Sequence, residues 1–107
     1  MKFEVNVDRE NAANLCIYVK GDINVHTSPV LREAMNSCFS DQTQSVRVFL
    51  DDVPRMDFSG IATLVEGLQW SRLSNRRFVI SGLTEEVRDL FVLSNLEDEF
   101  EISEAGE

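Results

Sequence analysis

The chain has 107 residues, 43% of them hydrophobic, and a formal net charge of −9 at pH 7. This length can bury one core and is too short for two ordinary domains, and the negative charge argues against nucleic acid as a partner, because phosphate neutralisation needs a basic surface. No apolar run is long enough to span a bilayer and the first residues lack a signal-peptide pattern, so we expect a cytoplasmic protein without membrane insertion.

The first predicted elements are two short segments of alternating polarity. Apolar side chains recur at every second residue over 3–7 and again over 15–19, and a polar break at 8–14 separates the segments. This pattern predicts two strands joined as a hairpin.

A helix is predicted after the loop 21–26. Ser28 and Pro29 form an N-cap and first-turn pair, and an apolar stripe over 30–38 faces inward. We expect this helix to end before Asp41.

The next predicted element is a central strand. Val46, Val48 and Leu50 lie on one side of it and Phe49 covers the other, which is typical of a strand buried on both faces. A tight loop then leads into a second helix, whose apolar residues recur at helical spacing from Ile61 onward. That helix is expected to begin close to the preceding serine and glycine.

Ser59, the serine at that helix start, has two interpretations. One is an ordinary N-cap, whose hydroxyl accepts a hydrogen bond from the first turn. The other is a site for an added phosphate, because first-turn N–H groups and the positive end of the helix dipole favour an anion. Asp57, two residues earlier, is either an ordinary loop carboxylate or a functional group. Close to the serine it would repel an added phosphate, and otherwise it would help to hold a partner's metal ion or orient the hydroxyl.

The last third of the chain predicts one more buried strand and one more helix. The strand covers 78–80, and Thr84 caps the helix that follows. Residues 97–107 include several acidic side chains and no basic one, which is typical of a solvated, partly disordered terminus. Within them, Phe100 and Ile102 either add a weak edge strand or pack as an extended tail.

The order of predicted elements is strand, strand, helix, strand, helix, strand, helix, with an optional last strand. This alternation predicts an α/β fold in which the later strands run parallel and helices cover at least one face of the sheet. We expect one domain over 1–102 and an acidic tail over 103–107. Loops at the carboxyl ends of parallel strands gather at one edge, so the Ser59 loop and the loop 22–27 are expected there.

Four short runs of residues carry a resemblance to a known family. The runs are Gly21-Asp22-Ile23-Asn24 with His26-Thr27, Val48-Phe49-Leu50-Asp51, Met56-Asp57-Phe58-Ser59-Gly60-Ile61, and Val87-Arg88-Asp89-Leu90-Phe91 with Ser94-Asn95-Leu96. Together they resemble a STAS domain and, more closely, a bacterial anti-sigma factor antagonist. The resemblance covers nearly the whole chain in the right order, and the Asp-x-Ser-Gly-Ile run is its most specific part.

The resemblance implies a STAS fold, with a four- to five-stranded mixed sheet and helices packed mainly on one face, and a switch protein that is not an enzyme. It implies that a partner kinase, an anti-sigma factor of the histidine-kinase-like ATPase type, phosphorylates Ser59 and that a serine phosphatase restores it. The unphosphorylated form binds the partner and the phosphorylated form releases it. The other residues that the resemblance places in the partner-binding surface are Asp22, Asn24, His26, Thr27, Met56, Asp57, Phe58, Gly60 and Ile61.

Two residues depart from the family's usual pattern. The family usually has an aspartate where this chain has Asn24, and often a small hydroxyl residue where it has Phe58. Asn24 keeps the hydrogen-bonding capacity without the charge, and Phe58 either adds an exposed apolar anchor or turns into the core. Either change is consistent with a different kinase partner.

A second class of STAS protein is an alternative. It is the subunit of an envelope lipid-transport ABC complex, in which the same surface contacts an ATPase and Ser59 is not modified. Several proteins of that class lack a serine at this position, so the serine favours the antagonist.

The sequence offers little in favour of an enzyme. His26 is the single histidine and has no nucleophile or metal cluster beside it, and there is no phosphate-binding loop of the nucleotide-hydrolase type. Cys16 and Cys38 are too few and too far apart for a metal cluster, so we expect buried free thiols. We therefore expect no cofactor and no metal.

Overall fold

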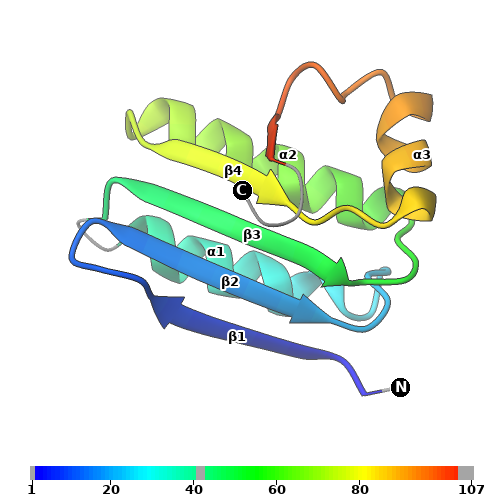
Figure 1. Cartoon of the computed structure of the whole chain (residues 1–107), viewed down its shortest axis with the longest axis horizontal. Helices are drawn as coiled ribbons and strands as arrows, with labels where there is room; N and C mark the ends of the chain where they lie inside the picture. The colour runs from blue at the N-terminus through cyan, green and yellow to red at the C-terminus, as the bar shows by residue number, and fades with distance from the viewer. Residues whose placement is uncertain (1, 41–42, 104–107) are drawn as a thin grey trace.

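The computed structural model describes residues 2–40 and 43–103, which form five strands and three helices (Figure 1). The strands are β1 (Glu4–Arg9), β2 (Asn14–Lys20), β3 (Ser45–Asp52), β4 (Arg77–Ser81) and β5 (Glu101–Ser103). The helices are α1 (Ser28–Ser40), α2 (Phe58–Leu73) and α3 (Glu85–Leu93).

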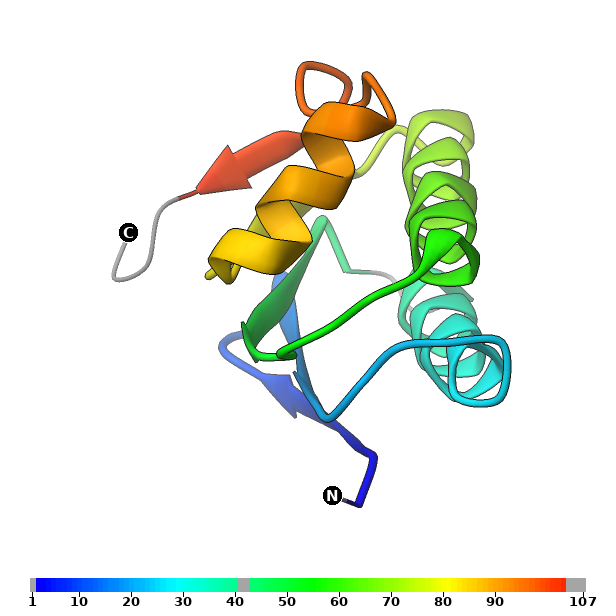
Figure 2. The same ribbon diagram turned by 90° about the vertical axis from the view of Figure 1, so that its right-hand side faces the viewer.

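The strands lie in one sheet in the order of the sequence, β1-β2-β3-β4-β5. β1 and β2 form the predicted antiparallel hairpin, and β3, β4 and β5 continue the sheet parallel to β2. Figure 2 shows α1 and α2 side by side on one face of the sheet, and Figure 1 shows α3 near the end of β4. The predicted mixed sheet with helices mainly on one face is confirmed.

The hydrophobic core lies between the sheet and the helices. Val46, Val48 and Leu50 of β3 are fully buried there, in one cluster with Leu64 of α2 and Phe91 of α3. Alternate residues of a strand point to the same face. The apolar residues at every second position of β3 therefore indicate which of its faces is buried. Burial of each such side chain stabilises the fold by about 1.5–3 kcal/mol.

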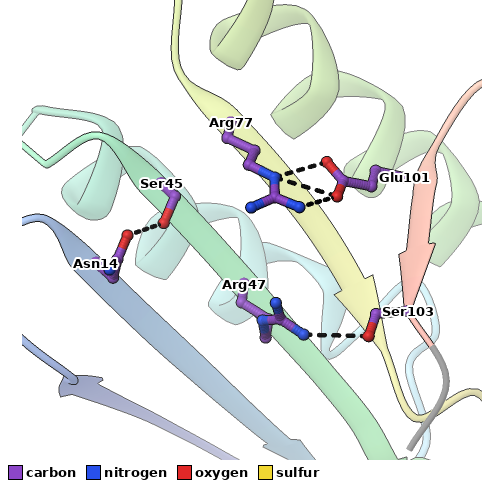
Figure 3. Close-up of polar contacts among 6 residues, drawn as sticks. All are labelled: Asn14, Ser45, Arg47, Arg77, Glu101 and Ser103. Atoms are coloured by element: carbon purple, nitrogen blue, oxygen red, sulfur yellow. Dashed lines mark hydrogen bonds and ion pairs between the residues drawn. The ribbon is translucent and has the colours of Figure 1, made fainter. Parts of the chain in front are cut away.

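The opposite face of the sheet is mixed in character, and none of the described helices covers it. Tyr18 of β2 and Phe49 of β3 stack there with their ring centroids 4.7 Å apart. Arg47 of β3 donates from Nη1 to the Ser103 hydroxyl at 3.3 Å, as Figure 3 shows. Phe49 is only half-buried, so the prediction that β3 is buried on both faces is wrong on this side.

A side-chain pair joins β5 to β4 in addition to the backbone ladder. Arg77 donates from Nε to both carboxylate oxygens of Glu101, at 2.9 and 3.1 Å (Figure 3). The hydrogen bond from this guanidinium, followed by a smaller opposing effect of burial, leaves the pKa of Glu101 below its ordinary value. The expected edge strand is therefore formed.

Phe100, just before β5, closes the core at this edge. Its side chain is 6% exposed, and its ring centroid lies 5.3 Å from that of Phe91 and 6.4 Å from that of Phe78. The prediction of a solvated terminus is wrong for Phe100, because its ring packs against two rings that are distant in the sequence. Of the predicted tail, Ser103 belongs to β5 and 104–107 lie outside the described residues.

Both cysteines, Cys16 and Cys38, are free and buried, as predicted. Burial raises the pKa of the Cys16 thiol above its ordinary value.

Across the part of the chain that the structure describes, every helix is too short or too polar to cross a membrane.

Candidate functional site

Two loops meet at the edge of the sheet where β2 and β3 end, beside the start of α2 (Figure 2). The first loop, 21–27, follows β2, and the second loop, 53–57, follows β3. A parallel β-bridge joins Ile23 of the first loop to Met56 of the second. The N–H of Ile23 donates to the carbonyl of Arg55, and the N–H of Asp57 donates to the carbonyl of Ile23, both at 3.1 Å. The predicted meeting of these loops is confirmed, and backbone hydrogen bonds fix it.

The helix α2 begins at Phe58, and its N-cap is Asp57. Asp57 has an extended backbone, with φ −107° and ψ −174°, and its side chain accepts a hydrogen bond from the N–H of Ser59 at 2.9 Å. The prediction that Ser59 is the N-cap is therefore wrong, since Ser59 is the second helical residue. Aspartate and serine are about equally good caps, and the apolar stripe that starts at Ile61 fixes the helix start only to within a turn.

The hydroxyl of Ser59 belongs to the same hydrogen-bonded cap. Ser59 Oγ donates a hydrogen bond to Asp57 Oδ1, which is also the oxygen that accepts from the N–H of Ser59. Asp57 is exposed and Ser59 is partly exposed, so the hydroxyl lies near the surface at the positive end of the helix dipole. Of the interpretations of Asp57 in the unmodified protein, the one in which it orients the hydroxyl fits this geometry.

Gly60 allows the first turn of α2 to lie close against both loops. A Cβ at this position would lie 2.9 Å from Ile23 Cγ2 and would overlap Cγ of Met56. Gly60 and Ile61 are buried, and Met56 is half-buried against the core. These three residues shape the backbone beneath Ser59 from inside the fold.

The loop before α1 is held by Asn24 and Thr27. Asn24 Oδ1 accepts from the N–H of His26 at 2.9 Å and from that of Thr27 at 3.2 Å. Thr27 Oγ1 accepts from the N–H of Asn24 and donates to the carbonyl of Asp22, both at 2.8 Å. The amide of Asn24 supplies the accepting oxygen that an aspartate would supply, so the loop keeps its shape without the charge.

Apolar side chains are exposed at the start of α2, in the loop before α1 and in α1 itself. Phe58 is 64% exposed, which decides between its two predicted positions in favour of the surface. Val25, in the neighbouring loop, is also 64% exposed, and Val30 of α1 is exposed as well. The sequence analysis did not single out Val25, although it stands between polar residues outside any strand or helix period. The prediction that the apolar stripe over 30–38 faces inward is wrong at its first residue, Val30.

The charged groups of this surface have both signs. Asp22, Asp57 and His26 are exposed, and Arg55 Nε lies 3.9 Å from Glu86 Oε2 of α3. Among the residues with described positions, no three His, Cys, Asp or Glu side chains gather in a way that could hold a metal ion. The polar groups of the arrangement support hydrogen bonding.

Comparison with known proteins gives consistent results. The anti-sigma-B factor antagonist of Bacillus subtilis (strain 168) is 29% identical over 104 residues, covering 96% of this chain and 94% of that protein. The anti-sigma factor antagonist SpoIIAA in its unphosphorylated form matches with a TM-score of 0.83 at 16% identity, over 97% of this chain and 90% of that one. The phosphorylated form of the Bacillus protein SpoIIAA matches with a TM-score of 0.77 at 14% identity, over 97% and 93%.

The structural matches show the fold, and a family model shows the family. The five-stranded mixed sheet and three helices correspond to the SpoIIAA fold. The model of the STAS domain matches residues 4–106, which is nearly the entire sequence. The chain therefore belongs to the STAS domain family.

Proposed function

We propose that this protein is a phosphorylation-switched binding module of a bacterial partner-switching pathway. Its unphosphorylated form binds an anti-sigma factor that is also a serine kinase of the histidine-kinase-like ATPase type, and this binding frees a sigma factor. Phosphorylation of Ser59 releases the partner, and a serine phosphatase restores the binding form. The protein acts in the cytoplasm and catalyses no reaction itself.

The observation that carries this proposal is the position of the Ser59 hydroxyl. It is partly exposed at the N-terminal end of α2, next in sequence to exposed Phe58. The likeness to an anti-sigma-B factor antagonist over nearly the whole chain supports the same role. So does the likeness to SpoIIAA, a protein that exists in a phosphorylated and an unphosphorylated form.

Charge is the physical basis of the switch. A phosphate on Ser59 adds about −1.5 to −2 charges at one point of the surface. Water solvates this charge on the free protein, whereas in a docked interface the same charge is desolvated. A coupling of about 3 kcal/mol between phosphate and partner changes the affinity roughly 150-fold, which is sufficient for release.

The proposed docking surface divides into contact residues and supporting residues. We assign contact with the partner to the exposed side chains of Asp22, His26 and Phe58, together with exposed Val25. Asn24 and Thr27 hold the first loop in shape through their hydrogen bonds. Met56, Gly60 and Ile61 support the second loop from the core side.

Phosphorylation of variants tests the proposal. Incubation with the cognate kinase and ATP is expected to add one phosphate, on Ser59, seen by intact-mass and fragment spectrometry. Ser59→Ala is expected to block it and to keep partner binding. Ser74→Ala, which removes an exposed hydroxyl at the other end of α2, is the matched control and keeps both properties. Phosphate on another residue, or none with a partner that binds, would contradict the proposal.

Co-purification separates this function from the alternative one. Recovery of a kinase-like ATPase with the protein supports the switch. Recovery of a membrane-transporter ATPase would instead support a subunit of an envelope lipid-transport ABC complex, in which Ser59 stays unmodified.

A further inference from the structure

One carboxylate oxygen holds both the side chain and the backbone of Ser59. Asp57 Oδ1 accepts from Ser59 Oγ and, at 2.9 Å, from the N–H of Ser59. The same side chain is the N-cap of α2. In the unmodified protein the hydroxyl proton therefore has an acceptor within the chain.

Phosphoryl transfer from a nucleoside triphosphate would remove this donor. As the bond between Ser59 Oγ and the γ-phosphorus forms, the bond from that phosphorus to the bridging oxygen breaks and the diphosphate leaves. The hydroxyl proton passes to a base of the kinase or to water. Ser59 Oγ then carries no hydrogen, and the new negative charge lies beside the carboxylate of Asp57.

Two effects of opposite sign act on that phosphate. The N-terminal end of a helix attracts it, but this end corresponds to only roughly half an elementary charge, and Asp57 already interacts with it. Asp57 carries a full negative charge next to a group of about −1.5 to −2. Either the two anions stay in contact or Asp57 turns away and α2 loses its cap, and both outcomes raise the free energy of the modified form.

We propose that Asp57 is a positioning residue, which holds the Ser59 hydroxyl in the unmodified state and destabilises the phosphorylated state. The inference rests on the proposed function, because it concerns the modification suggested there. It assigns to one residue both the orientation of the hydroxyl before transfer and a penalty on the product afterwards.

Phosphoserine installed at position 59 during translation tests this without any kinase. The melting temperature is compared with and without the phosphate in the otherwise wild-type chain, in Asp57→Asn and in Asp89→Asn. In the wild-type chain the phosphate is expected to lower Tm by about 4 °C. Asp57→Asn keeps the capping oxygen without the charge, so the drop should shrink to half or less. Asp89→Asn removes the same charge from an exposed position in α3 and should leave the drop unchanged.

A phosphate that does not lower Tm, or a drop of equal size in all three proteins, would overturn the inference. Should Asp57→Asn fail to fold, the wild-type chain decides alone. Raising the salt concentration from about 0.05 to 0.5 M screens repulsion between surface charges, so the drop must shrink, and a drop independent of salt overturns the inference as well.

The two proposals fail separately. A serine that no kinase modifies would remove the proposed function and leave the measured cost of phosphoserine as it is. Equal stability of the two forms would remove the role of Asp57 and leave partner binding and release as they are.

Discussion

Among single residues of the site, Phe58 offers a partner the most apolar surface. It is the first residue of α2, next to Ser59, and 64% of it is exposed. Aromatic side chains near the centre of an interface often provide a large share of the binding energy, because covering them removes much apolar area from water. Phe58 is therefore a candidate anchor for a partner.

Replacing that ring tests its role. Phe58→Ser is expected to weaken binding of the kinase partner at least tenfold, since about 1.4 kcal/mol corresponds to a factor of ten. Stability should change by no more than about 0.5 kcal/mol, because the ring is on the surface. Leu73→Ser is the control, since Leu73 is 87% exposed at the opposite end of the same helix. Calorimetry that finds equal affinities for both variants would show that Phe58 is no anchor.

Between elements, an ion pair ties α1 to α2. Arg32 Nε and Nη2 donate to the two carboxylate oxygens of Glu66, at 2.7 and 2.9 Å. The guanidinium also lies 5.8 Å from the centre of the Trp70 ring. The hydrogen bond from Arg32 lowers the pKa of Glu66 below its ordinary value. The pair thus links the two helices that cover the sheet through a contact that depends on charge.

The direction of that shift predicts a dependence on pH. Because the folded pKa of Glu66 lies below its unfolded value of about 4.3, the pair stabilises the fold above that pH and its contribution is lost as the pH falls through the folded pKa. Glu66→Gln should lower Tm slightly near pH 7, and the difference from wild type should disappear as the pH falls below the folded pKa of Glu66. Glu33→Gln, at an exposed position of α1, should have a smaller effect near pH 7. A Tm difference for Glu66→Gln that persists in acid would exclude this origin.

For the molecule as a whole, Phe100 determines whether the last described residues belong to the cooperative unit. It packs against Phe78 of β4 and Phe91 of α3, and is 6% exposed. These contacts join one edge of the sheet to the core on which the remaining elements also pack. Loss of this ring should therefore lower the free energy of unfolding of the whole domain.

Truncating this side chain measures that contribution. Phe100→Ala is expected to reduce the free energy of unfolding by about 3–5 kcal/mol, the usual range for a buried phenylalanine. Leu93→Ala, at an exposed position of α3, is the control and should change it by less than about 0.5 kcal/mol. Urea denaturation followed by circular dichroism gives both values. A loss below about 1 kcal/mol for Phe100→Ala would mean that this edge unfolds separately from the core.

Much of the fold was predictable because the spacing of apolar residues along the sequence indicates which side chains are buried. The alternation of Val46, Val48 and Leu50 predicts a strand and also its buried face, and both are found. The status of β5 was not decided, because three residues in an acidic segment form a strand only through contacts with β4. The packing of Phe100 depends on rings that are distant in the sequence.

The site was predictable at the level of its loops and less so at the level of its side chains. The carboxyl ends of parallel strands meet at one edge, so the meeting of the two loops followed from the order of the elements. The order of the elements does not show whether Asp57 or Ser59 caps α2, because both residue types are good N-caps. The exposure of Phe58 and Val25 depends on how α2 and the first loop are oriented in the fold, and no local pattern reports that.

The order of strands in the sheet also affects how the chain is made. Every strand pair joins neighbours in the sequence. A chain that leaves the ribosome from its N-terminus can therefore add each new strand to an existing edge, and no strand has to be inserted between two others. Both loops of the site are synthesised before β4 and β5, which extend the sheet beyond β3 on the side away from β2.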